Sequence, residues 1–174
     1  MVGSSDPSTT VSIWAAVVPT APTNVMRIPG TNTETTIDLQ WSKAYNGGST
    51  ITGYQVWWNQ GGDGPVTDVK HVLNTDTTTL QITQLTPGQE YGFAVKAINV
   101  VGESTLSTLA VIMSATVPDP PTIPQLVSQS ETQIELVWEQ NVNNGGTPLT
   151  EFKLYWDYNG YASVLQTISA DTNS

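Results

Sequence analysis

The stretch Leu85-Thr86-Pro87-Gly88-Gln89-Glu90-Tyr91 carries the pattern that decides the fold. Pro87-Gly88 has the composition of a tight turn, because proline presets φ and glycine accepts positive φ. From Tyr91 to Val95 large and small residues then alternate, which is the period of a strand with one buried face. An Asn-x-x-Gly sequence at residues 99–102 ends this strand in a second turn. The stretch therefore predicts a corner that feeds one long strand.

Alternating apolar segments bounded by turn residues predict six further strands around this one. We expect the seven strands near residues 22–28, 35–42, 51–59, 67–73, 79–84, 90–99 and 107–115. Side chains two positions apart share one face of a strand, so alternation also predicts which residues face inward. These are Ile37, Leu39, Trp41, Tyr54, Val56, Trp58, Leu80, Ile82, Tyr91, Phe93, Val95, Ala97, Ala110 and Ile112.

The corner and the strand that ends in Trp41 together resemble the fibronectin type III module. The resemblance implies an all-β, immunoglobulin-like sandwich of two sheets with seven strands per complete module. In that family a tryptophan and the tyrosine that opens the sixth strand face each other across the sandwich. The residues that match this core signature are Trp41, Leu85, Pro87, Tyr91 and, in a second copy, Trp138. We expect the Tyr91 hydroxyl to form a hydrogen bond back to the corner near Leu85.

The chain repeats itself with a period of about 98 residues. Residues 34–41 recur in similar form as 131–138, and residues 46–54 recur as 144–152. A period of this length is the size of one module rather than of a short solenoid repeat. The sequence therefore predicts a tandem array.

The phase of the repeat predicts three parts. Residues 1–18 match the last strand of a preceding module, residues 19–117 form one complete module, and residues 118–174 match the first four strands of a following module. We therefore expect this stretch to be a window on a longer array. The linkers between modules are short and contain several prolines, which stiffens them.

Composition excludes several classes of function. The 174 residues include 15 acidic and 5 basic residues, for a net charge of −10, which repels nucleic acid at long range. No apolar run is long enough to cross a membrane as a helix. Without cysteine the chain has no disulfide, thiolate metal site or cysteine nucleophile. We expect no nucleic-acid partner and no membrane span in this segment.

Catalysis has almost no support in the sequence. His71 is the only histidine and lies in a short predicted strand, where an exposed edge position is a simpler explanation than a catalytic base. The glycine clusters at residues 46–48 and 61–64 do not stand between a strand and a helix, so they are turns rather than phosphate-binding loops. We predict that the chain is not an enzyme and has no cofactor or metal.

One surface feature indicates a binding site. The outward positions of the third, sixth and seventh strands are more apolar than a half-solvated sheet requires. These residues are Trp57, Ala94, Ile98, Leu109, Val111 and Met113, with Trp14 and Tyr155 at equivalent positions of the neighbouring copies. An apolar patch with an aromatic anchor is typical of an interface. The alternative is that Lys96 lies over Trp57 as a cation–π pair and that linkers or loops cover the rest.

We expect a non-catalytic structural or adhesive segment of a longer repetitive extracellular or cell-surface protein. Its partners would be proteins, through self-association or neighbouring modules, in a filament or another assembly. One alternative is a cytoplasmic, cytoskeletal spacer or docking module of a giant protein. Another is a carbohydrate-binding accessory domain of a secreted hydrolase, with Trp57 or Trp14 stacking on sugar. The threonine-rich segments 33–36 and 75–79 are candidates for O-glycosylation. Solubility is a simpler explanation for their high threonine content.

Overall fold

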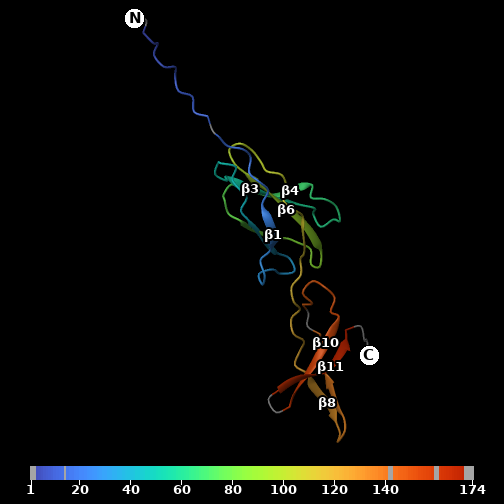
Figure 1. Cartoon of the computed structure of the whole chain (residues 1–174). Helices are drawn as coiled ribbons and strands as arrows, with labels where there is room; N and C mark the ends of the chain where they lie inside the picture. The colour runs from blue at the N-terminus through green and yellow to red at the C-terminus, as the bar shows by residue number, and fades with distance from the viewer. Residues whose placement is uncertain (1–2, 14, 141–142, 159–160, 171–174) are drawn as a thin grey trace. The chain divides into compact units, whose positions relative to one another are not determined.

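A computed structural model describes residues 3–13, 15–140, 143–158 and 161–170. Every regular element in these residues is a β-strand (Figure 1). The strands are β1 (Thr23–Arg27), β2 (Ile37–Ser42), β3 (Gly53–Trp58), β4 (Asp68–Leu73), β5 (Thr79–Ile82), β6 (Glu90–Ile98), β7 (Ala110–Met113), β8 (Gln125–Gln129), β9 (Ile134–Val137), β10 (Glu151–Tyr158) and β11 (Tyr161–Ser169). Trp14, one of the predicted interface residues, lies outside the described residues.

The first seven strands form two sheets. The smaller sheet has the order β1-β2-β5, and the larger has the order β4-β3-β6-β7. All seven strands lie where the alternation of apolar residues places them. The predicted all-β sandwich fold is therefore confirmed.

By internal contacts the chain divides into two compact units. The first comprises Met1–Met26, Gln40–Thr79 and Gly92–Ala110, and the second comprises Arg27–Leu39, Leu80–Tyr91 and Val111–Ser174. Within the first unit β3, β4 and β6 lie side by side, and within the second β10 and β11 lie side by side (Figure 1).

The first unit is built on β3, which pairs antiparallel with β4 on one side and with β6 on the other. Burial alternates as predicted from Tyr54 to Trp57, because Tyr54 and Val56 are fully buried whereas Gln55 and Trp57 are only partly covered. Trp58, also predicted to face inward, is only half-buried. Trp41 of β2 packs edge to face on Tyr54, with ring centroids 5.4 Å apart. This contact joins the two sheets, and each such buried side chain stabilises the fold by roughly 1.5–3 kcal/mol.

Serine side chains attach the segment before β7 to β6. The Ser104 and Ser107 amides donate to the carbonyls of Ala97 and Val95, each at 2.9 Å. In return the Ala97 and Val95 amides donate to the Ser104 and Ser107 hydroxyl oxygens, also at 2.9 Å. Because side-chain oxygens take the place of main-chain acceptors here, the regular strand begins at Ala110 rather than near the expected residue 107.

The second unit contains the predicted corner. The Tyr91 hydroxyl accepts a hydrogen bond from the Thr86 amide at 2.9 Å, which confirms the bond expected near Leu85. Leu85 itself is buried, and its amide donates to the Thr35 carbonyl at 3.0 Å. Pro87 is exposed, so it shapes the turn and does not belong to the core.

The remaining strands of the second unit repeat part of this pattern. β8 pairs with β9, and β10 pairs with β11, in two separate two-stranded sheets. Trp138 packs edge to face on Phe152 with centroids 6.2 Å apart, as Trp41 does on Tyr54. The repeated sequence therefore produces a repeated aromatic contact.

Candidate protein-binding face

Trp57 lies at the centre of the outer face of β3. In register it stands opposite Ala94 of β6 and Val69 of β4. Directly opposite residues share one side of a sheet, so all three point away from the core side. Val69 is 43% exposed, but Ala94 is only 2% exposed. The expectation that Ala94 supplies exposed surface is therefore corrected, because its short methyl side chain lies below its larger neighbours.

Lys96 holds the Trp57 ring from the neighbouring strand. Its Nζ lies 4.9 Å from the ring centroid, in a cation–π contact. The same ammonium pairs with the Glu103 carboxylate at 3.1 Å. The alternative raised from the sequence, a cation over the indole, is therefore present, and it leaves less of the Trp57 ring for other contacts.

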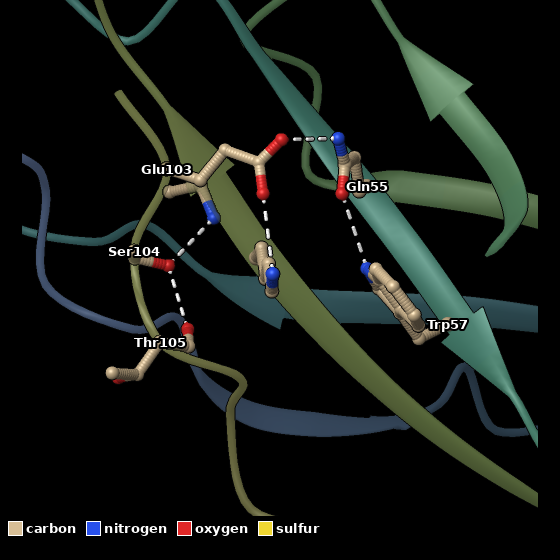
Figure 2. Close-up of polar contacts among 7 residues, drawn as sticks. Gln55, Trp57, Glu103, Ser104 and Thr105 are labelled. Carbon is tan, nitrogen blue, oxygen red and sulfur yellow. Dashed lines mark hydrogen bonds and ion pairs between the residues drawn. The ribbon is translucent and has the colours of Figure 1, made fainter. Parts of the chain in front are cut away.

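Gln55 completes the network around the indole. Its amide nitrogen donates to Glu103 at 2.7 Å, and its amide oxygen accepts from Trp57 Nε1 at 3.2 Å (Figure 2). Lys96, Glu103, Gln55 and Trp57 thus form a closed circuit of contacts. A side chain held in this way loses little further conformational entropy on binding.

Sequence reasoning named Trp57 and Lys96 but missed Gln55 and Glu103. The pairing of β3 with β6 sets Gln55 directly opposite Lys96, so a correct register would have found it. Glu103 comes from the loop after β6, and no periodic pattern marks it.

Exposed aliphatic side chains border this network within the first unit. Val72 stands opposite Gln55 and is 49% exposed. Leu109 is 50% exposed, and its Cδ1 would lie 3.1 Å from a Cβ added at Gly92 of β6. With Val69 these residues make an apolar margin, and we call Trp57, Val69, Val72, Lys96 and Leu109 the Trp57 face.

A β-bulge explains why Val69 and Val72 share this face. Residues three apart on a regular strand point to opposite sides. The β3–β4 register shifts between Val56 and Trp57, so β4 carries one extra residue at that point. Both valines are thereby turned outward, which simple alternation along the sequence cannot predict.

The other predicted interface residues differ in their exposure. Ile98 is half-buried at the end of β6. In the second unit Val111 and Met113 of β7 are exposed, as is Tyr155 of β10. Four of the eight predicted positions thus carry an exposed apolar side chain, namely Leu109, Val111, Met113 and Tyr155. The structure brings Trp57 together with Val69 of β4 and places Leu109 beside β6.

The second unit repeats the central pair of the face. Tyr155 stands opposite Val164, and both are more than half exposed. The β10–β11 register shifts just before Tyr155, at the position equivalent to the shift before Trp57. An outward aromatic residue beside an outward valine is thus found in both copies.

The described residues offer little that resembles an active site. No group of three or more histidine, aspartate or glutamate side chains among them is placed to hold a metal ion. His71 is exposed on β4. The Lys43 ammonium lies 2.6 Å from Asp76, and this hydrogen bond lowers the pKa of the Asp76 carboxyl. Such a solvent-exposed pair contributes little stability.

A cavity of about 190 Å³ lies in the second unit, between the proline-rich segment at residues 118–124 and the Trp138–Phe152 pair. Small-molecule sites usually have volumes of about 300–1,000 Å³. The cavity is smaller than this range, and its aromatic wall belongs to the local packing. In the described part of the chain no helix is long and apolar enough to cross a membrane.

Comparison with known proteins points to one family. The model of the fibronectin type III domain matches residues 20–112. A Xenopus laevis protein described as "Cell adhesion molecule-related/down-regulated by oncogenes" is 32% identical over 136 residues, which are 72% of this chain and 11% of that protein. Human "Fibronectin type-III domain-containing protein 3A" is 29% identical over 160 residues, 88% of this chain and 13% of that protein.

Among solved structures, titin domains A168–A170 align with a TM-score of 0.49 and 24% identity, over 57% of this chain and 33% of that one. The chain spans 11% and 13% of the length of the two curated relatives named above.

Proposed function

The chain belongs to the fibronectin type III family, and from this premise we propose that it is a non-catalytic, adhesive or structural segment of a longer repetitive protein. Its partner in this proposal is a second copy of the same kind of module, bound through the Trp57 face. We place the module boundaries at residues 1–18, 19–117 and 118–174, and the family match to residues 20–112 supports the middle one.

The repeated aromatic–valine pair carries this proposal. Trp57 with Val69, and Tyr155 with Val164, occupy equivalent registers beside equivalent bulges. Exposed apolar groups cost free energy in water unless a partner covers them. A face that recurs from module to module suits a partner that is itself a module, because identical patches can pair about a two-fold axis.

Charge also favours this face over the rest of the surface. With a net charge of −10, two copies repel each other at long range. On the Trp57 face the Lys96 ammonium pairs with the Glu103 carboxylate at 3.1 Å, so these two charges cancel. The face is therefore close to neutral around Trp57, which lowers the repulsion between two copies on contact.

The proposed location is the cell surface or the extracellular space. The name of the Xenopus relative, which refers to cell adhesion, supports this choice. Sugar stacking on Trp57 is less well supported, because Lys96 and Gln55 already engage the indole.

Light scattering over a concentration series of the 174-residue chain tests the proposal. We expect the apparent mass to rise with concentration, and we expect Trp57→Ser and Val69→Ser to reduce or abolish the rise. Val100→Ser is the matched control, because Val100 is 70% exposed but lies in the loop after β6 rather than on the sheet. A chain that remains monomeric at every concentration would overturn the proposal.

A further inference from the structure

The Asn-Gly-Gly turn before β3 lies against residues 17–20, the linker segment that leads into the complete module. The Val17 amide donates to the Gly47 carbonyl at 2.9 Å, and the Thr20 amide donates to the Tyr45 carbonyl at 3.0 Å. The Tyr45 amide in turn donates to the Thr20 hydroxyl at 3.0 Å. The linker is thus joined to the turn by main-chain bonds at two points three residues apart.

The second Asn-Gly-Gly turn holds its own preceding linker in the same way. The Thr116 amide donates to the Gly145 carbonyl at 2.9 Å, and the Asp119 amide donates to the Asn143 carbonyl at 3.2 Å. These two bonds are the equivalents of the pair at Val17 and Thr20 in the repeat. The same arrangement therefore occurs twice in one chain, with different linker side chains.

The first glycine of each turn is required on two separate grounds. Gly47 and Gly145 are buried, with φ of 68° and 74°, in the left-handed region that disfavours other residues. A Cβ at Gly47 would overlap the Val17 carbonyl oxygen, and one at Gly145 would overlap the Thr116 carbonyl oxygen. The linker backbone therefore occupies the space that a side chain would take.

The asparagine of each turn fixes its shape. The Asn46 side-chain oxygen accepts from the Gly48 amide at 3.0 Å, and the Asn144 oxygen accepts from the Gly146 amide, also at 3.0 Å. Such a bond to the backbone two residues on stabilises a turn without a strand partner. The surface that meets the linker is thus preformed.

Asn99 adds a third attachment in the first unit. Its side-chain nitrogen donates to the Val17 carbonyl at 2.7 Å and to the Asn46 carbonyl at 2.9 Å. Asn99 is 3% exposed, and its side-chain oxygen accepts from the Val101 and Gly102 amides. One buried side chain therefore ties the linker, the turn and the loop after β6 together.

From these contacts we infer that the Asn-Gly-Gly turn is a binding site for the main chain of the preceding linker. Because the contacts are made to backbone atoms, the site accepts linkers of different sequence. Each linker is then a fixed extension of the module that follows it, and its direction is set by that module as well as by its prolines. This inference does not depend on the Trp57 face.

Amide hydrogen exchange, measured residue by residue on the whole chain by NMR, tests the inference. We expect the amides of Val17, Thr20, Thr116 and Asp119 to exchange about tenfold more slowly, relative to their intrinsic rates, than that of Thr10. Thr10 is an exposed residue outside any strand and gives the unprotected reference. Exchange of Val17 and Thr116 as fast as that of Thr10 would overturn the inference without any variant.

Two alanine variants give reciprocal results. Gly47→Ala should remove the protection of Val17 and Thr20 while leaving that of Thr116 intact. Gly145→Ala should do the reverse. The two sites lie in different copies of the repeat. If one variant unfolds its copy, the amide exchange of the other variant still tests the inference.

Gly30→Ala is the matched control. Gly30 has φ of 80°, but a Cβ there would meet nothing within 4 Å, so the variant carries the left-handed strain without the clash. We expect it to leave all four linker amides protected. Loss of linker protection in Gly30→Ala equal to that in Gly47→Ala would show that general destabilisation, rather than the clash with the linker backbone, removes the protection, and would overturn the inference.

Discussion

Tyr54 and Tyr91 are both buried, but their hydroxyl groups differ in hydrogen bonding. The Tyr91 hydroxyl accepts from the Thr86 amide. The Tyr54 hydroxyl and the Trp41 indole nitrogen, both buried, have no hydrogen-bond partner among the described residues. An unsatisfied buried polar group costs free energy, whereas a satisfied one contributes modestly to stability.

Tyr54→Phe and Tyr91→Phe therefore form a matched pair. We predict that Tyr91→Phe lowers the free energy of unfolding by about 1–2 kcal/mol, because the Thr86 amide loses its acceptor. Tyr54→Phe should leave stability unchanged or raise it by up to about 1 kcal/mol. Urea unfolding of the two variants measures the difference, and equal losses would contradict the prediction.

Burial also raises the pKa of the Tyr54 hydroxyl. The pKa of a tyrosine in an unfolded chain is about 10. Above that pH the unfolded chain therefore loses a proton that the folded chain retains. The stability that neutral Tyr54 provides is thus full below about pH 10 and is lost as pH rises through the higher folded pKa. We predict that the free energy of unfolding falls less from about pH 9 to about pH 11 in Tyr54→Phe than in the parent chain. Equal falls in the two proteins would refute this prediction.

At the scale of elements, the segment before β7 depends on serine rather than on a regular ladder. The Ser107 hydroxyl accepts from the Val95 amide and donates to the Thr108 carbonyl at 3.0 Å. Ser107→Ala should lower the free energy of unfolding by about 1–3 kcal/mol, because it leaves a buried amide without its acceptor. The exposed neighbour Thr108→Ala should change stability by less than about 0.5 kcal/mol. Thermal unfolding of both variants measures this, and similar effects would contradict it.

Most elements follow from the local period of the sequence. Alternation identifies the strands and the buried residues Ile37, Leu39 and Phe93, because a one-sided core imposes a period of two. Alternation fails where the period is broken. The bulge in β4 turns Val69 and Val72 to one side, and burial of Ala94 depends on the size of its cross-strand neighbours.

The candidate face was only partly predictable for the same reason. Trp57 and its contact with Lys96 follow from adjacent outward positions on paired strands. Glu103 reaches the network from a loop, and loop geometry has no periodic signal in the sequence.

At the scale of the whole molecule, the chain is a repeat whose copies share local contacts. The edge-to-face aromatic pair, the bulge before the outward aromatic residue and the Asn-Gly-Gly turn each occur twice. Each of these three features can therefore be mutated in one copy while the unchanged copy in the same chain serves as the control.

The most direct test of the central claim, that outward aromatic residues of repeated modules drive self-association, is sedimentation velocity of the whole chain over a concentration series. It should compare the parent with Trp57→Ser, Tyr155→Ser and the double variant. We predict concentration-dependent association of the parent, weaker association of each single variant and a monomeric double variant. Association of the double variant equal to that of the parent, or a parent that stays monomeric throughout, would contradict the claim.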